Sequence, residues 1–249
     1  MPPRATRPRR CCPTGTTETD DPKAGTRVPE IALIVGAGSG LSAALARLFA
    51  KEGMRVALAA RDIRKLETLC GQTGACAYPC DATKPADVAT LFTRIVSEIG
   101  ALDLVVYNAG QRVRGSIADV DAAAVQQSLM SLAYGGFLVA QHAARAFLQK
   151  GSGTLLFTGA SASVKGYPKS APFAMGKFAL RGLAQALARE LQPQNIHVGH
   201  VVIDGAIGHS DDDNRLDPDA IAQTYLQLHR QPRSTWSWEI ELRPWRETF

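Results

Sequence analysis

The 249-residue sequence lacks a hydrophobic run long enough to cross a bilayer, so no membrane partner is expected. It also lacks a signal-peptide hydrophobic region, and its Arg-rich start lacks the apolar face of a transit peptide. The five cysteines are odd in number, and Cys11 and Cys12 are adjacent, so no disulfide framework is indicated. Cys70, Cys76 and Cys80 lack metal-ligand spacing and are expected to be ordinary thiols in a reducing compartment. These absences predict a cytoplasmic protein and no metal site.

The net charge of +5 is concentrated near the start of the chain. Residues 1–29 hold +3 of it, and the remainder shows no basic stripe with interleaved aromatic side chains. A nucleic-acid partner is therefore not expected. Residues 1–29 are also rich in Pro, Thr, Arg and Gly and have almost no large apolar side chain, which predicts a disordered tail before one domain at residues 30–249.

A glycine-rich turn follows the first apolar run of that domain. Residues 31–35 are all apolar, as in a strand buried on both faces, and Gly36, Gly38 and Gly40 lead into a helix that begins near Leu41. Glycines let the backbone approach a ligand closely, and the first N–H groups of a helix favour a phosphate. The alternative is a tight strand–helix turn that binds nothing.

Strands and helices then alternate along the chain. This alternation predicts parallel strands joined by crossover helices, hence an α/β fold: a single-domain, doubly wound, Rossmann-type seven-stranded parallel sheet with helices on both faces. Gly135 and Gly136 interrupt the longest helical tract and are expected to let another segment approach closely. The expected strands are residues 31–35, 54–60, 75–80, 102–107, 154–158, 196–203 and 238–242. The expected helices after the first are residues 61–71, 86–99, 122–150, 171–191 and 217–231.

Polar residues follow the next three strands, at the edge where such a sheet binds its ligand. Arg61 follows the second strand and could neutralise the 2′-phosphate of NADP, whereas an acidic residue there would favour NAD. Alternatively, Arg61 is merely solvated or ion-paired, and Asp62 caps a helix. Asp81 could accept a hydrogen bond from adenine or cap the next helix, and Asn108 lies beside small residues that leave room for a nicotinamide ribose. NADP(H) is therefore favoured over NAD(H).

These segments together resemble the short-chain dehydrogenase/reductase family over about residues 29–205. Gly36-Ala37-Gly38-Ser39-Gly40-Leu41-Ser42 is similar to its glycine-rich turn, except that Ser42 replaces the usual last glycine. Cys80-Asp81-Ala82-Thr83 resembles its adenine-side segment, and Asn108-Ala109-Gly110 matches its Asn-Ala-Gly segment. The resemblance implies a small-molecule substrate and a homodimer or homotetramer. It implies cofactor contacts from Gly36, Gly38, Ser39, Gly40, Leu41, Arg61, Asp81, Ala82, Asn108, Ala109, Gly110 and Lys177.

The catalytic segment departs from the family's pattern. Lys177 is present, but Phe173 stands where the family has tyrosine, and a benzene ring cannot exchange a proton. The usual serine position falls on Ala160, with Ser161 one residue later, and the usual asparagine falls near Leu132. Ser161 and Tyr167 are therefore the candidate catalytic hydroxyls beside Lys177. Other conceivable proton donors are Ser163, Tyr134, Asp204 and His209.

Two functions remain open from the sequence. One is an oxidoreductase that moves hydride between NADP(H) and a carbonyl, an alcohol or an activated double bond, with a non-standard proton donor. The other is a catalytically silent relative that binds NADP(H) and serves a structural or regulatory role. Residues 207–233 are expected to form a lid over the crevice. The acidic run that begins at Asp211 could repel anionic substrates, but a solvated loop is the favoured interpretation.

Overall fold

Seven parallel strands form the centre of the computed structural model, which describes residues 28–210 and 212–246. The sheet has the order β3-β2-β1-β4-β5-β6-β7. This confirms the predicted doubly wound, seven-stranded sheet. The strands are β1 (Ile31–Val35), β2 (Arg55–Ala60), β3 (Cys76–Pro79), β4 (Leu104–Tyr107), β5 (Gly153–Thr158), β6 (Ile196–Ile203) and β7 (Glu239–Leu242).

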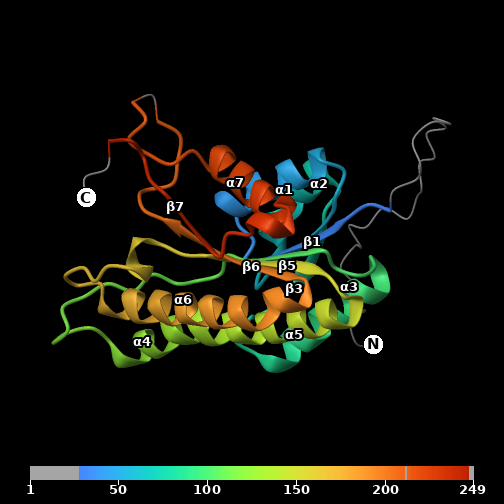
Figure 1. Cartoon of the computed structure of the whole chain (residues 1–249). Coiled ribbons are helices and arrows are strands. Elements are labelled where there is room, and N and C mark those ends of the chain that lie inside the picture. The colour runs from blue at the N-terminus through green and yellow to red at the C-terminus, as the bar shows by residue number, and fades with distance from the viewer. Residues whose placement is uncertain (1–27, 211, 247–249) are drawn as a thin grey trace, which may run out of the picture.

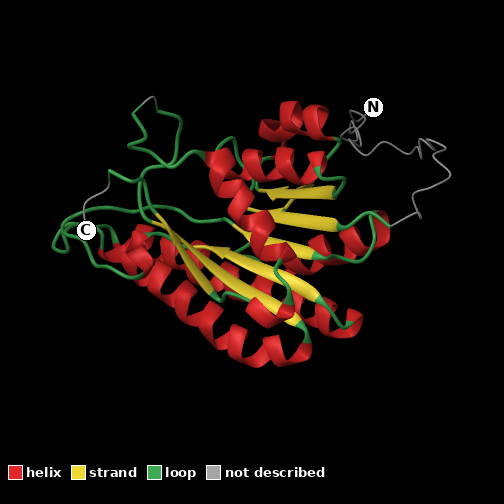
Figure 2. Ribbon diagram, turned by 45° about the horizontal axis from the view of Figure 1, so that its top comes forward, coloured by secondary structure: helices red, strands yellow, loops and turns green. Residues whose placement is uncertain are grey.

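Helices cover both faces of the sheet (Figures 1 and 2). Side chains alternate between the two faces along each strand, so Leu33 and Val35 join one core while Ala32 and Ile34 join the other. One face carries α3 (Pro85–Glu98), α5 (Gly135–Lys150) and α6 (Ala171–Leu191), with α4 (Ala122–Leu129) packed against α6. The other face carries α1 (Leu41–Lys51), α2 (Glu67–Thr73) and α7 (Pro218–Arg230).

Each expected strand begins and ends within two residues of the observed strand. The second helix differs, because a 3₁₀ turn at Ile63–Leu66 precedes α2. The long tract at residues 122–150 is helical throughout, but a π-helical turn at Met130–Tyr134 separates α4 from α5. The predicted lid at residues 207–233 is wrong for the 13 residues of α7, because this helix packs on α1 and belongs to the helical layer.

Three other expectations concern membrane spans, the tail and the cysteines. No helix within the described residues is long and apolar enough to cross a membrane. The predicted disordered tail lies outside the described residues, except for its last two. Cys76 is disulfide-bonded, so the expectation of an ordinary thiol is wrong there, because a cysteine's pairing is not encoded in local spacing.

Gly135 marks the point where α5 packs closely on the sheet. A Cβ atom there would lie 2.6 Å from the hydroxyl oxygen of Tyr107 and 3.0 Å from the backbone oxygen of Ala82. At Gly136 the nearest atom would be Leu180 Cδ1, also at 2.6 Å. The predicted close approach is therefore confirmed, and it fixes α5 over β4.

This packing predicts opposite effects for one substitution at two helical glycines. Gly135→Ala should lower the free energy of unfolding by about 1–3 kcal/mol through overpacking. Gly182→Ala on α6 should raise it by up to about 1 kcal/mol, because nothing lies within 4 Å of its added Cβ and alanine favours helix. Urea unfolding of both variants checks this, and equal effects would contradict the packing argument.

Candidate active site

The strand order reverses between β1 and β4. These two parallel strands are neighbours in the sheet, although β2 and β3 separate them in sequence. Ligands of doubly wound sheets bind at such a switch point, beyond the carboxyl ends of the strands. A cavity of about 230 Å³ opens there, and we call it the first cavity. It is lined by residues 35–37, 59–61, 80–83, 107–111 and Ser131.

The glycine-rich turn is joined to the end of β4 by direct contact. Gly36 has φ +86°, and an added Cβ would lie 2.5 Å from the backbone of Ala109, so glycine is required. Ser42 Oγ donates to the carbonyl oxygen of Gly36 (3.1 Å) and accepts from Asn108 Nδ2 (2.8 Å). The serine that replaces the family's last glycine thus ties the first turn to Asn108.

The rest of the turn leaves open space beside the helix start. Added Cβ atoms at Gly38 and Gly40 would meet nothing within 4 Å, and no side chain of the described residues caps α1. The side chain of Leu41 is buried in the core, so only its backbone can face a ligand. Ser39 is among the residues that do not line the first cavity. Cofactor binding by Gly38, Ser39, Gly40 and Leu41 stays a prediction.

Arg61 lines the first cavity at the end of β2. Its neighbour Asp62 caps the following 3₁₀ turn and forms an ion pair with Arg64 at 2.9 Å. The hydrogen bond from Arg64 lowers the pKa of Asp62 to about 2. Arg61 itself forms no ion pair within the described residues, so its guanidinium is available to a ligand.

Asp81 and Ala82 line the same cavity at the end of β3. Asp81 Oδ1 accepts hydrogen bonds from the backbone N–H (3.1 Å) and the hydroxyl (2.8 Å) of Thr83. Partial burial raises the pKa of Asp81, but the Thr83 hydrogen bonds and nearby cations outweigh it, so the net pKa is lowered. The carboxylate is therefore ionised and partly engaged in its own turn.

A second cavity of about 580 Å³ adjoins the first and shares Asn108, Ala109 and Gly110 with it. Its walls come from the loops after β4, β5 and β6 and from α6. They include Arg112, Arg114, Leu132, Thr158, Ala160, Ser161, Tyr167, Phe173, Lys177, Ile203, Asp204 and Ile207.

Lys177 lies almost fully buried in the wall of the second cavity. Its ammonium donates to the carbonyl oxygen of Thr158 at 2.6 Å and lies 5.7 Å from the centre of the Phe173 ring. Burial lowers the pKa of Lys177 from its ordinary 10.5 to about 8. A cation held in this way can bind the hydroxyl groups of a ligand in the second cavity.

The candidate hydroxyls separate into two groups. Ser161 and the half-exposed Tyr167 line the second cavity, as the sequence predicts. Ser163 does not line it and instead accepts a hydrogen bond from the backbone N–H of Ala160 at 3.1 Å. Tyr134 lies elsewhere, stacked on Phe137. This grouping favours Ser161 and Tyr167 over the other two hydroxyls.

Asp204 and His209 are poor candidates as proton donors. Asp204 lines the second cavity, but its carboxylate pairs with Lys165 (3.1 Å) and Arg243 (2.8 Å). His209 is exposed and does not line the cavity.

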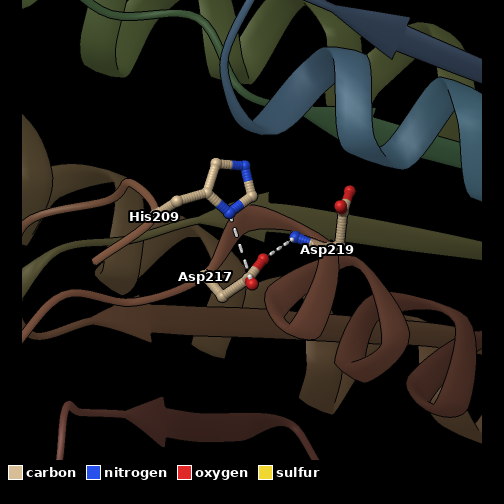
Figure 3. A group of neighbouring side chains, drawn as sticks. All are labelled: His209, Asp217 and Asp219. Atoms are coloured by element: carbon tan, nitrogen blue, oxygen red, sulfur yellow. Dashed lines mark hydrogen bonds and ion pairs between the residues drawn. The ribbon is translucent and has the colours of Figure 1, made fainter. Parts of the chain in front are cut away.

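His209 instead approaches two carboxylates at the start of α7 (Figure 3). Its Nδ1 lies 3.4 Å from Asp217, whose carboxylate also caps α7 by accepting from the Asp219 backbone at 2.7 Å. Asp219 in turn lies 3.7 Å from Arg47. These exposed groups are engaged with one another, with a helix N-terminus and with an arginine, which does not favour a cation site.

Three residues of the wall occupy the positions at which the family has polar side chains. Phe173 and Ala160 carry no polar side-chain atom, and Leu132 fills the space between two glycines. Added Cβ atoms at Gly110 and Gly176 would lie 2.4 Å and 2.6 Å from the side chain of Leu132. At these three positions the wall of the second cavity is therefore apolar.

Sequence reasoning missed Arg112 and Arg114, which contribute charge to the second cavity. Their position directly after Asn108-Ala109-Gly110, at the carboxyl end of β4, is the signal that could have identified them.

The fold and the paired cavities define a Rossmann-type protein with a ligand crevice at its switch point. A family model described as short chain dehydrogenase matches residues 30–210. The chain belongs to the short chain dehydrogenase family.

Individual relatives agree with this assignment. The chain is 30% identical to "Short chain aldehyde dehydrogenase 1" of Euphorbia lathyris, over 77% of this chain and 66% of that protein. It is 29% identical to an uncharacterised oxidoreductase of Staphylococcus aureus, over 86% and 97% of the two chains.

Solved structures agree as well. The crystal structure of a short-chain dehydrogenase from Rhodopseudomonas palustris is 32% identical, with a TM-score of 0.79 over 87% of this chain and 99% of that chain. A metagenomic short-chain oxidoreductase in complex with NADP is 25% identical, with a TM-score of 0.78 over 86% and 97%.

The buried Lys177 predicts a pH-dependent stability effect. Its lowered pKa corresponds to about 3 kcal/mol of cost in the folded state at neutral pH. Lys177→Met should therefore raise the free energy of unfolding by about 1–3 kcal/mol at pH 7. The gain should shrink as pH rises from about 8 towards 10.5, where the unfolded lysine also loses its proton.

Urea unfolding at pH 7 and pH 9.5 measures this difference. Lys65→Met, at an exposed lysine on the 3₁₀ turn before α2, is the matched control and should show no such gain. A pH-independent loss of stability in Lys177→Met would contradict the argument.

Proposed function

We propose that this chain binds NADP(H) across the first cavity and transfers hydride to or from a carbonyl, alcohol or activated double bond in the second. The observation that carries this proposal is that the two cavities share Asn108, Ala109 and Gly110, with the buried ammonium of Lys177 in the wall of the second. A dinucleotide that follows this crevice has its nicotinamide end at these shared residues. The family to which the chain belongs supports the same reaction class.

The first cavity and the glycine-rich turn beside it fit a dinucleotide. Open space at Gly38 and Gly40 beside an uncapped helix suits a pyrophosphate, and Arg61 suits a 2′-phosphate. Asp81 and Ala82 are placed for the adenine, and Asn108, Ala109 and Gly110 for the nicotinamide ribose. The NADP complex of the metagenomic oxidoreductase supports this choice over NAD(H).

When bound, the cofactor supplies or accepts the hydride. Lys177 is placed to hold the ribose hydroxyls, while Phe173 can neither donate nor accept a proton. Ser161 and Tyr167 are the candidate hydroxyls that line the substrate cavity and could transfer the proton. Cofactor binding without turnover on carbonyl compounds would favour the alternative, a silent NADP(H)-binding relative.

Homodimers or homotetramers are proposed to form through α5 and α6. Large apolar side chains on these helices are substantially exposed in the single chain, which favours burial against another copy. They are Phe137, Leu148, Met175 and Phe178. The cytoplasmic location stays a prediction from the sequence.

Arg61→Ala tests the cofactor preference. It should weaken NADPH binding about 10- to 100-fold, the effect of losing a charge-assisted contact, and leave NADH binding unchanged. Titration calorimetry with both nucleotides measures this. Arg64→Ala is the matched control, because that guanidinium already pairs with Asp62. Equal losses for NADPH and NADH would refute the assignment of Arg61.

Phe173→Tyr tests the reaction class. A phenol at this position lines the second cavity near Lys177, and general acid catalysis should raise carbonyl reduction about 10²- to 10⁴-fold. Steady-state oxidation of NADPH with a panel of carbonyl substrates measures the gain. Val96→Tyr adds a phenol at an exposed site on α3, away from the second cavity, and should change nothing. Identical rates for both variants would argue against a carbonyl site here.

A further inference from the structure

The second cavity has an unbalanced charge. Arg112, Arg114 and the buried Lys177 contribute positive charge to its walls. Among the described residues that line it, Asp204 alone is acidic. That carboxylate is 5% exposed and is already paired with Lys165 and Arg243.

Neither Arg112 nor Arg114 forms a hydrogen bond or an ion pair within the part of the chain that the structure describes. The Arg112 guanidinium instead lies over the Phe173 ring, 5.3 Å from its centre. Burial, and then repulsion from Arg114, lowers the pKa of Arg112, so the two guanidiniums act on one another without a carboxylate between them. An anion between them would relieve this repulsion.

The acidic residues after β6 do not fill this role. The second cavity is lined by Ile207 but not by Asp212 or Asp213. Asp212 instead accepts from Asn214 at 3.0 Å and lies 3.9 Å from Arg246. Asp211 lies outside the described residues. The exposure of Asp212 and Asp213 is compatible with the expected solvated loop, and neither side chain lines the cavity that holds the two arginines.

We propose that the second cavity recognises substrates that carry an anionic group, a carboxylate or a phosphate, through Arg112 and Arg114. The planar guanidinium presents a fork of donors that matches either group in a bidentate geometry. The apolar side chains of Leu132, Phe173 and Ile207 then contact the hydrocarbon part. Arg112, stacked on Phe173, places the anionic group beside the reaction centre. As a statement about substrate, this rests on the proposed function, but anion binding itself does not require turnover.

Titration calorimetry of the full chain with saturating NADP⁺ tests the proposal. The probes are benzoylformate, its neutral methyl ester and phenyl phosphate, so carboxylate and phosphate are compared directly. We expect at least one anion to bind about tenfold or more tightly than the ester, with a preference that weakens as salt rises. Ester binding as tight as that of both anions, or no measurable binding of either anion, would overturn the proposal.

Variants assign the effect to the arginines. Arg112→Gln and Arg114→Gln should each weaken anion binding about tenfold, and the double variant should remove the preference over the ester. Arg145→Gln, an exposed arginine on α5 that does not line the cavity, is the matched control and should change nothing. Thermal unfolding checks that each variant folds.

These titrations and the turnover assay together separate anion binding from two other questions: whether the arginines bind the cofactor, and whether the chain is an oxidoreductase. If the arginine variants weaken NADP⁺ binding and leave the anion preference intact, the arginines serve the cofactor and the proposal fails. If the anion binds through the arginines but no carbonyl or alcohol compound is turned over, the anion site stands and the proposed oxidoreductase function fails.

Discussion

The contact between Gly36 and Ala109 is the constraint on which the ligand crevice depends. β1 and β4 are adjacent in the sheet, and the turns that leave them must pass each other at the switch point. An added Cβ at Gly36 would lie 2.5 Å from the Ala109 backbone, so only glycine lets these turns meet. Ser42 and Asn108 then join them by a hydrogen bond of 2.8 Å. The first cavity opens along this junction and continues into the second.

Lys177 shows which of the family's catalytic features this chain has kept. A lysine beside a phenol can lower the pKa of that phenol and also hold the nicotinamide ribose. Because Phe173 stands in place of the phenol, there is no phenol whose pKa Lys177 could lower. A buried ammonium with a lowered pKa still costs stability, and it is nevertheless retained and held by the Thr158 carbonyl. Its presence is therefore compatible with the proposed second role, in which a binding group is kept at a cost in stability.

Sequence patterns predicted the sheet because each strand is an apolar run followed by polar or glycine residues, and crossover helices force parallel pairing. The same logic placed Arg61, Asp81 and Asn108 at one edge, and the structure brings them to one cavity. Positions that depend on tertiary packing were not predictable in this way. The Ser42–Asn108 bond joins residues 66 positions apart, and the insertion of Leu132 between Gly110 and Gly176 follows no local pattern.

The replaced residues change where polarity resides in the substrate cavity. Ala160, Leu132 and Phe173 make the wall apolar on the sides that come from β5, the π-helical turn and α6. Charge comes instead from Lys177 and from the loop after β4, where Arg112 packs on the Phe173 ring. An aromatic ring at residue 173, whether phenyl or phenol, stabilises a cation above its face, so the position of Arg112 does not depend on the missing hydroxyl. Phe173 therefore removes the family's proton donor from the cavity but keeps the aromatic face on which the guanidinium packs.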